Sequence, residues 1–151
     1  HCTAPIFADP VSTAKAGKLA SVLGHLHTLK PNRMEAELLS GVKITDEASL
    51  HRAADTLLAT GLQRVFLSLG ADGVLAADHE RTLHLRNLPA RMVNTTGCGD
   101  AFMAAVACAF LDGADLETAA RYGLAASAVA MESADTINPA MSLAALAERI
   151  Q

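Results

Sequence analysis

Strand-like and helix-like segments alternate along this 151-residue chain, and the alternation restricts its possible folds more than any other feature. The strand-like runs are 5–9, 26–30, 64–69 and 74–77, with a weaker edge-strand pattern at 83–85. The helical segments are 12–23, 33–39, 47–59, 101–111, 116–131 and 143–150. Strand–helix–strand order implies right-handed crossovers and a mostly parallel sheet with helices on both faces. The sequence therefore predicts an α/β fold, as a single domain over residues 1–151.

Capping and turn residues mark the ends of several segments. Asn32 and Asp46 precede two helical segments as N-caps, and Gly41 and Gly61 follow the same segments as stop residues. The string Gly70-Ala71-Asp72-Gly73 predicts a turn that brings the chain back as a second strand.

Charge, hydropathy and cysteine usage exclude several classes of function. Because the net charge is −4 and no basic cluster is present, we expect neither a nucleic-acid nor a membrane-surface partner. No apolar run reaches transmembrane length. The three cysteines show no CxxC spacing, which argues against a disulfide framework or a zinc site and favours the reducing cytoplasm.

The string Asn94-Thr95-Thr96-Gly97-Cys98-Gly99-Asp100 comes just before the helical run 101–111. Glycines bare the backbone N–H groups, and such groups at a helix N-terminus bind phosphate oxygens. The predicted donors are the N–H groups of Gly97, Cys98, Gly99 and Asp100. A carboxylate beside an anion site suits phosphoryl transfer to an alcohol, because it can accept the hydroxyl proton. The alternative without a functional role is that Thr96 caps a core helix and Asp100 is a solvated acid in its first turn.

A second candidate is the pair Asn32 and Glu35, three residues apart at a predicted helix start. The pair fits a capping box, in which Glu35 only satisfies the helix end. It also fits a carboxylate that holds Mg²⁺ through water, because Mg²⁺ keeps several waters and needs few carboxylates. The spacing alone leaves both readings open.

The string at 94–102 resembles the C-terminal signature of the ribokinase-like carbohydrate kinase family, usually written with Asp-Thr-Thr-Gly-Ala-Gly-Asp. The resemblance extends from about Pro5 to Pro139 and corresponds to the C-terminal half of a family member. It implies a ribokinase-like fold without the N-terminal half and the lid. It also implies ATP-dependent phosphoryl transfer to a sugar or nucleoside hydroxyl, with Asp100 as the catalytic base.

The first predicted strand begins almost at residue 1, so the chain looks cut from something longer. The resemblance implies that this sequence lacks the N-terminal half of a family member, which binds the sugar. We therefore expect little kinase activity from this chain alone, because nothing remains to bind and desolvate the acceptor.

The same resemblance implies the ligands ATP and Mg²⁺ and assigns residues to them. Glu35, together with Asn32, would place Mg²⁺ through water. The segment 68–73 resembles the family's nucleotide-contacting loop. The residues expected at the nucleotide are Asn32, Ser68, Gly70, Asp72, Gly73 and Thr96. The small side chains at 123–127 could leave room for an adenine ring or could serve helix packing, and both readings stay open.

Two positions depart from the family pattern. Asn94 replaces the Asp that opens the signature and often helps to bind a monovalent cation. An Asn carbonyl can still coordinate K⁺ but brings no charge, so the resemblance leaves a need for K⁺ open. Where the family often has Asp-x-Asn-x-Arg, this chain keeps Asp9 but has Val11 and Thr13. Ser12 or Lys15 could take over part of the polar role, or the segment could be a solvated helix start.

Two strings, 9–12 and 27–41, look specifically like the pseudouridine kinase subfamily, which phosphorylates the 5′-hydroxyl of pseudouridine with ATP. Two other functions stay open: another sugar or nucleoside kinase of the family, and a non-catalytic nucleotide-binding module. The expected partners are a nucleotide and a small-molecule substrate. An exposed sheet edge near 6–9 would also allow self-association into a homo-oligomer.

Overall fold

The computed structural model describes residues 3–150. Contacts divide the chain into two compact units, one ending at His84 and the other beginning at Leu85. The single domain expected over residues 1–151 therefore stays a prediction. Among the described residues, no helix combines the length and the apolar character needed to cross a membrane.

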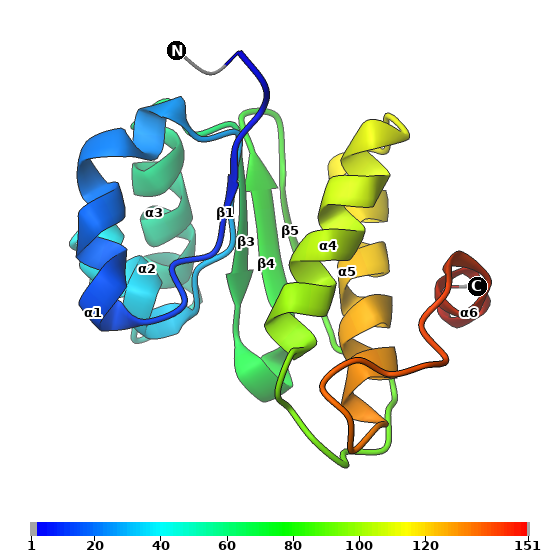
Figure 1. The fold of residues 1–151 in the computed structure, drawn as a ribbon. Coiled ribbons are helices and arrows are strands. Elements are labelled where there is room, and N and C mark those ends of the chain that lie inside the picture. Colours follow the sequence, from blue (N-terminus) through cyan, green and yellow to red (C-terminus); the bar gives the residue numbers. More distant parts are fainter. Residues whose placement is uncertain (1–2, 151) are drawn as a thin grey trace. The chain divides into compact units, whose positions relative to one another are not determined.

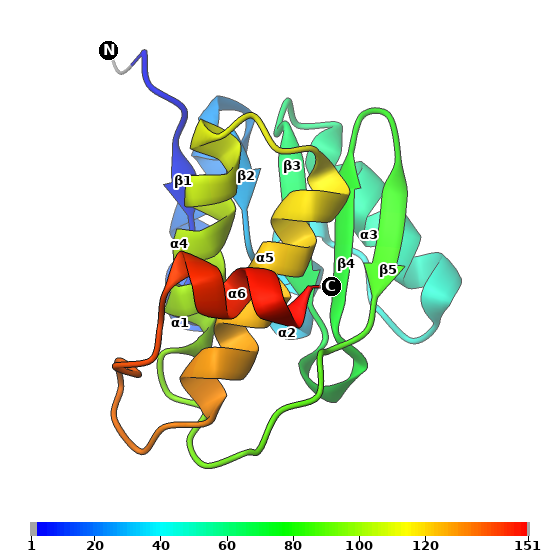
Figure 2. The same cartoon turned by 90° about the vertical axis from the view of Figure 1, so that its right-hand side faces the viewer.

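The strands of residues 3–150 lie side by side in the order in which they follow in the sequence (Figures 1 and 2). They are β1 (Phe7–Ala8), β2 (Thr28–Leu29), β3 (Arg64–Ser68), β4 (Val74–Asp78) and β5 (Thr82–Leu85). β1, β2 and β3 are parallel, whereas β3 and β4 form an antiparallel hairpin. The predicted α/β class is confirmed, with a sheet that is mixed.

The helices of the first unit are α1 (Thr13–Ala16), the 3₁₀ helix η1 (Gly17–His25), α2 (Arg33–Ser40) and α3 (Glu47–Leu58). The prediction of one α-helix over 12–23 is wrong beyond its first turn, where the chain continues as η1. Gly17 and Gly24 both lie in this segment, and glycine disfavours the α-helix. Gly24 also packs so closely that a Cβ atom there would lie 2.3 Å from the carbonyl oxygen of Thr60.

Both predicted N-caps are confirmed. Asn32 and Asp46 each accept a hydrogen bond from the backbone N–H three residues on, at 2.9 and 2.7 Å. Gly41 ends α2 in the left-handed conformation, with φ 71°, as a stop residue should. Gly61 lies one residue further from the end of α3 than predicted, because Ala59 is the C-cap.

The core of the first unit is aliphatic. The side chains of Leu29, Leu57, Val65, Leu67 and Leu75, from β2, α3, β3 and β4, are fully buried. Burial of each such side chain contributes about 1.5–3 kcal/mol. These contacts hold α3 against the sheet and so fix the strand ends that follow it.

The second unit consists of α4 (Cys98–Leu111), α5 (Leu116–Met131) and α6 (Leu143–Arg149), with α6 lying across α5 (Figure 2). Gly123 of α5 faces the ring of Phe102 on α4, where a Cβ atom would lie 2.7 Å from the ring. Ala125 is fully buried. Of the two readings left open for the small residues at 123–127, helix packing therefore accounts for Gly123 and Ala125.

The close approach of Gly24 to Thr60 predicts a large difference between two glycines of η1. Gly24→Ala should lower the free energy of unfolding by about 1–3 kcal/mol, because its methyl group has no space against the Thr60 backbone. Gly17→Ala is the matched control, since a Cβ atom at Gly17 meets nothing within 4 Å. It should be neutral or stabilise by about 0.4–1 kcal/mol. Urea unfolding measures both, and equal stability of the two variants would contradict this packing.

Candidate functional site

In the first unit, parallel pairing brings polar residues to the carboxyl ends of β1 and β2. Ala8 pairs with Leu29, so Asp9 and Lys30 leave their strands at the same level. The Lys30 Nζ atom lies 2.8 Å from Asp9 Oδ2, and only 7% of Lys30 is exposed. The edge beyond the carboxyl ends of parallel strands is where α/β proteins place ligands.

Asp9 also shapes the turn that follows β1. Its second carboxylate oxygen, Oδ1, accepts a hydrogen bond of 3.0 Å from the backbone N–H of Val11. Val11 has a φ of 67°, which is uncommon for a β-branched residue. Its side chain is exposed. Such a conformation costs on the order of 1–3 kcal/mol and persists only where the surroundings impose it. The ion pair and this turn together fix the segment at the sheet edge.

Lys30 is a residue that sequence reasoning missed. The sequence left open whether Ser12 or Lys15 takes over part of the motif's polar role or whether the segment is a solvated helix start. In the structure the Ser12 side chain makes no cap hydrogen bond and Lys15 is exposed. The available signal was positional, because Asp9 and Lys30 each directly follow a strand of one parallel pair.

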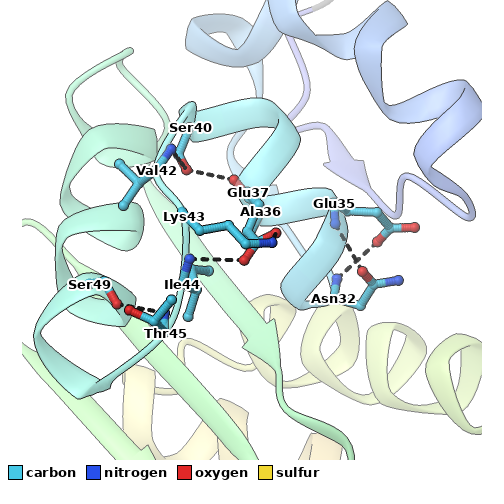
Figure 3. Close-up of polar contacts among 10 residues, drawn as sticks. All are labelled: Asn32, Glu35, Ala36, Glu37, Ser40, Val42, Lys43, Ile44, Thr45 and Ser49. Carbon is cyan, nitrogen blue, oxygen red and sulfur yellow. Dashed lines mark hydrogen bonds and ion pairs between the residues drawn. The ribbon is translucent and has the colours of Figure 1, made fainter.

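Asn32 and Glu35 form a reciprocal capping box at the start of α2 (Figure 3). Asn32 Oδ1 accepts from Glu35 N, and Glu35 Oε2 accepts from Asn32 N, both at 2.9 Å. Glu35 is buried, with 2% of its surface exposed, whereas Asn32 is exposed. The capping reading is thus confirmed, and it leaves Glu35 Oε1 without a hydrogen-bond partner among residues 3–150.

The same residues fit a water-mediated Mg²⁺ contact. Within the described part of the chain, no three His, Cys, Asp or Glu side chains gather as a metal cage. A Mg²⁺ ion that keeps its waters and binds substrate phosphates needs only one or two carboxylates, and Glu35 supplies one. The assignment of Mg²⁺ to Glu35 stays a prediction.

Ser68 lies beside Asn32, to which it is joined by a parallel bridge between the two segments. Its backbone N–H donates to Pro31 O at 2.9 Å. The turn that follows is closed by the N–H of Leu69, which donates to Gly73 O at 2.8 Å. The hairpin turn predicted at 70–73 is confirmed. Its contact with a nucleotide, through Ser68, Gly70, Asp72 and Gly73, stays a prediction.

In the second unit, the glycine turn is itself the first turn of α4. The helix begins at Cys98 rather than at residue 101, and Gly97 is the N-cap with a φ of 83°. No side chain caps this end, so the alternative in which Thr96 serves as the cap is wrong. Gly97 is required here because a Cβ atom would lie 2.8 Å from Thr136 O.

This helix end offers unpaired donors. The N–H groups of Gly97, Gly99 and Asp100 reach no acceptor among residues 3–150, whereas Cys98 N–H donates to Thr95 O at 3.3 Å. Unpaired N–H groups at the positive end of a helix dipole form an anion site. The geometry therefore fits the phosphate-binding role expected of the turn.

Asp100 is exposed at the third position of α4. Its carboxylate has no counterion among the described residues, and it lines a pocket of about 800 Å³ that also includes residues of α5 and α6. The pocket follows α4 from Gly97 to Asp112 and is walled mainly by apolar side chains. An uncompensated carboxylate beside free N–H donors is able to accept a proton.

Cys98 is a packed residue rather than an activated thiol. Burial raises the pKa of its thiol above the usual value, so the group is protonated at neutral pH. Its carbonyl oxygen accepts a hydrogen bond of 2.9 Å from Ser127 Oγ, which ties the start of α4 to α5.

Known proteins similar to this chain are carbohydrate kinases. Residues 1–143 match the pfkB family carbohydrate kinase model. The chain is 37% identical over 141 residues to the pseudouridine kinase of Escherichia coli (strain K12), a match that covers 93% of this chain and 45% of that protein. It is 31% identical over 110 residues to the ribokinase of Haemophilus influenzae, covering 73% and 36%. The chain thus spans less than half the length of these curated relatives.

Solved kinase structures share the fold. The crystal structure of a Clostridium perfringens protein, provisionally named a sugar kinase, matches with a TM-score of 0.92 and 32% identity, covering 97% of this chain and 46% of that one. The ribokinase of Thermotoga maritima matches with 0.85 and 26%, covering 99% and 50%. Escherichia coli phosphofructokinase-2 in complex with potassium matches with 0.83 and 26%, covering 97% and 46%. The predicted ribokinase-like fold is confirmed.

The Asp9–Lys30 ion pair predicts strong coupling between its two residues. Lys30→Met should lower the free energy of unfolding by about 2–4 kcal/mol, because it leaves the Asp9 carboxylate without its counterion. The double variant Asp9→Asn/Lys30→Met should regain part of this loss. Lys15→Met, at an exposed lysine, is the control and should change stability little. Urea unfolding of the unaltered chain, Asp9→Asn, Lys30→Met and the double variant gives the coupling energy, and a value near zero would contradict the pairing.

Proposed function

The chain belongs to the pfkB family of carbohydrate kinases, and we propose that it forms the ATP-binding and catalytic half of a kinase that phosphorylates a sugar or nucleoside hydroxyl. One observation carries this proposal: free N–H groups at the start of α4 lie next to a carboxylate that has no counterion within the described residues. Phosphoryl transfer needs both features, donors for the charge that develops on the phosphoryl oxygens and an acceptor for the hydroxyl proton.

The proposed roles follow from what each group can do. Gly97, Gly99 and Asp100 present free N–H groups to the transferred phosphoryl, and the N–H of Cys98 would join them by leaving Thr95 O. The dipole of α4 adds positive potential at the same point. Because the free donors are held by the helix backbone, they need no reorganisation during the reaction. The Asp100 carboxylate takes the proton of the attacking hydroxyl as general base.

The nucleotide is proposed to be ATP with Mg²⁺. Glu35 would hold the ion through water, since its Oε1 atom is free of the capping box. Mg²⁺ would supply charge neutralisation for the phosphates. Further nucleotide contacts are proposed for Asn32, Ser68, Gly70, Asp72, Gly73 and Thr96.

Pseudouridine is the proposed acceptor, because the chain is 37% identical to a pseudouridine kinase. Ribose is the second candidate, supported by 31% identity to a ribokinase. A panel of nucleosides and free sugars, tested with a polypeptide that also contains the acceptor-binding half, separates the two. Potassium is left out of this proposal, although it is present in the similar phosphofructokinase-2 structure, because residue 94 is an amide in this chain.

Asp100→Asn should lower turnover by about 100-fold to 10,000-fold, the usual contribution of a general base, while ATP binding stays within a few-fold. Turnover is measured by coupled ADP release in the longer polypeptide, because this chain spans less than half of its relatives. Binding is measured by calorimetry.

Asp112→Asn is the matched control, since Asp112 is also an exposed carboxylate on the same pocket but lies just past the other end of α4. It should leave turnover unchanged. A loss of less than about tenfold in Asp100→Asn, or 1.4 kcal/mol of barrier, would show that Asp100 is not the base.

Glu35→Gln should keep the fold but weaken Mg²⁺-dependent ATP binding. Gln can replace Glu in a capping box, so the free energy of unfolding should change by less than about 0.5 kcal/mol. The loss of the carboxylate charge should raise the Mg²⁺ concentration needed for ATP binding by about tenfold, which is 1.4 kcal/mol. Glu47→Gln, in the exposed first turn of α3, is the control. An unchanged Mg²⁺ requirement in Glu35→Gln would refute the metal assignment.

A further inference from the structure

Asn94 lies between two loops of the second unit and bonds to both. Its Oδ1 atom accepts a hydrogen bond of 3.0 Å from the backbone N–H of Thr96. Its Nδ2 atom donates to the carbonyl oxygen of Ala134 at 3.2 Å. Its own backbone N–H donates to Met131 O at 3.1 Å. One side chain therefore joins the segment that leads into α4 to the segment that follows α5.

The two joined segments also touch at the glycine turn. The backbone of Gly97 lies against Thr136 O, close enough that a Cβ atom would be 2.8 Å away. The same loop is held at its other end by Asn138, whose Nδ2 donates to Val129 O at 2.6 Å. The position of the 133–136 loop therefore sets the position of the turn that begins α4, and Asn94 is the side chain that bridges them.

The bridge needs one acceptor and one donor. Thr96 offers an N–H group and Ala134 offers a carbonyl oxygen, so the side chain between them must accept on one side and donate on the other. An amide does both, whereas an ionised carboxylate only accepts. With Asp at this position, a carboxylate oxygen would face the Ala134 carbonyl oxygen, and two negative atoms would meet. A monovalent cation between them would relieve the repulsion, because carboxylate and carbonyl oxygens are the ligands that such ions take.

We propose that the Asn94 amide replaces a monovalent cation in this chain, so that the loops around the glycine turn are joined without K⁺. The resemblance associates a monovalent cation with an Asp at the start of the signature. The groups around Asn94 do not fit that cation, because the Asn94 amide already bonds to Thr96 N–H and to Ala134 O. The converse also follows: Asn94→Asp should create a cation site between the new carboxylate and Ala134 O. This inference concerns how the turn is held and goes beyond the proposed kinase activity, on which it does not depend.

The test is thermal unfolding of the 151-residue chain in potassium chloride and in tetramethylammonium chloride at equal ionic strength. Tetramethylammonium screens charge equally but is too large to sit between two oxygen atoms. The melting temperature of the unaltered chain should differ by less than about 1 °C between the salts. Asn94→Asp should melt lower than the unaltered chain in tetramethylammonium and gain at least about 3 °C in potassium. Asn94→Ala, which removes both hydrogen bonds, should melt lower in both salts with no gain from potassium.

Two results would overturn the proposal. A rise in the melting temperature of the unaltered chain with K⁺ would show that a cation already joins these loops. An Asn94→Asp chain that gains nothing from K⁺, or that is unfolded in both salts, would show that no cation site lies between residue 94 and Ala134. Because no substrate is added, either result is independent of whether the chain is a kinase.

Discussion

The parallel register of β1, β2 and β3 is the constraint on which the first unit depends. Pairing of Ala8 with Leu29, and of Leu29 with Val65, makes the three strands end at one edge. The Asp9–Lys30 ion pair forms only because of this register, and a shift of one residue would turn each strand's side chains to the opposite face. The buried aliphatic side chains of the same strands hold the register in place. The polar edge and the apolar core are therefore products of one strand alignment.

In the second unit, the start of α4 depends on the left-handed conformation of Gly97. Gly97 turns the chain against Thr136 O and begins α4 without a side-chain cap. An ordinary N-cap would satisfy the first N–H groups of the helix and lower its affinity for an anion. The lack of a cap thus costs some helix stability and leaves donors available. A polar group is also left available at α2, where the capping box uses the Oε2 atom of Glu35 and leaves its Oε1 atom without a hydrogen-bond partner among the described residues.

Asn94 illustrates how one substitution alters the way a motif is held. The backbone path around Gly97 needs its two neighbouring segments joined, and either an amide or a cation with a carboxylate can join them. The amide does so through two hydrogen bonds, without a soluble ion. On this proposal, the need for a cation depends on whether one atom of the residue 94 side chain donates or accepts a hydrogen bond.

Local features were predictable from the sequence, because the interactions that cause them span three or four residues. The N-caps Asn32 and Asp46, the stop at Gly41 and the turn at 70–73 are of this kind, and so is the glycine-turn string itself. The sequence missed the 3₁₀ helix η1, the Asp9–Lys30 pair and the contact of Gly97 with Thr136. The Asp9–Lys30 pair and the contact of Gly97 with Thr136 each join residues that lie 21 or more positions apart. In η1, Gly24 packs against Thr60, which is also far away in the sequence. The sequence by itself thus determined the local elements and the candidate motif, whereas only the tertiary structure decided which polar groups meet, because that choice depends on packing between distant segments.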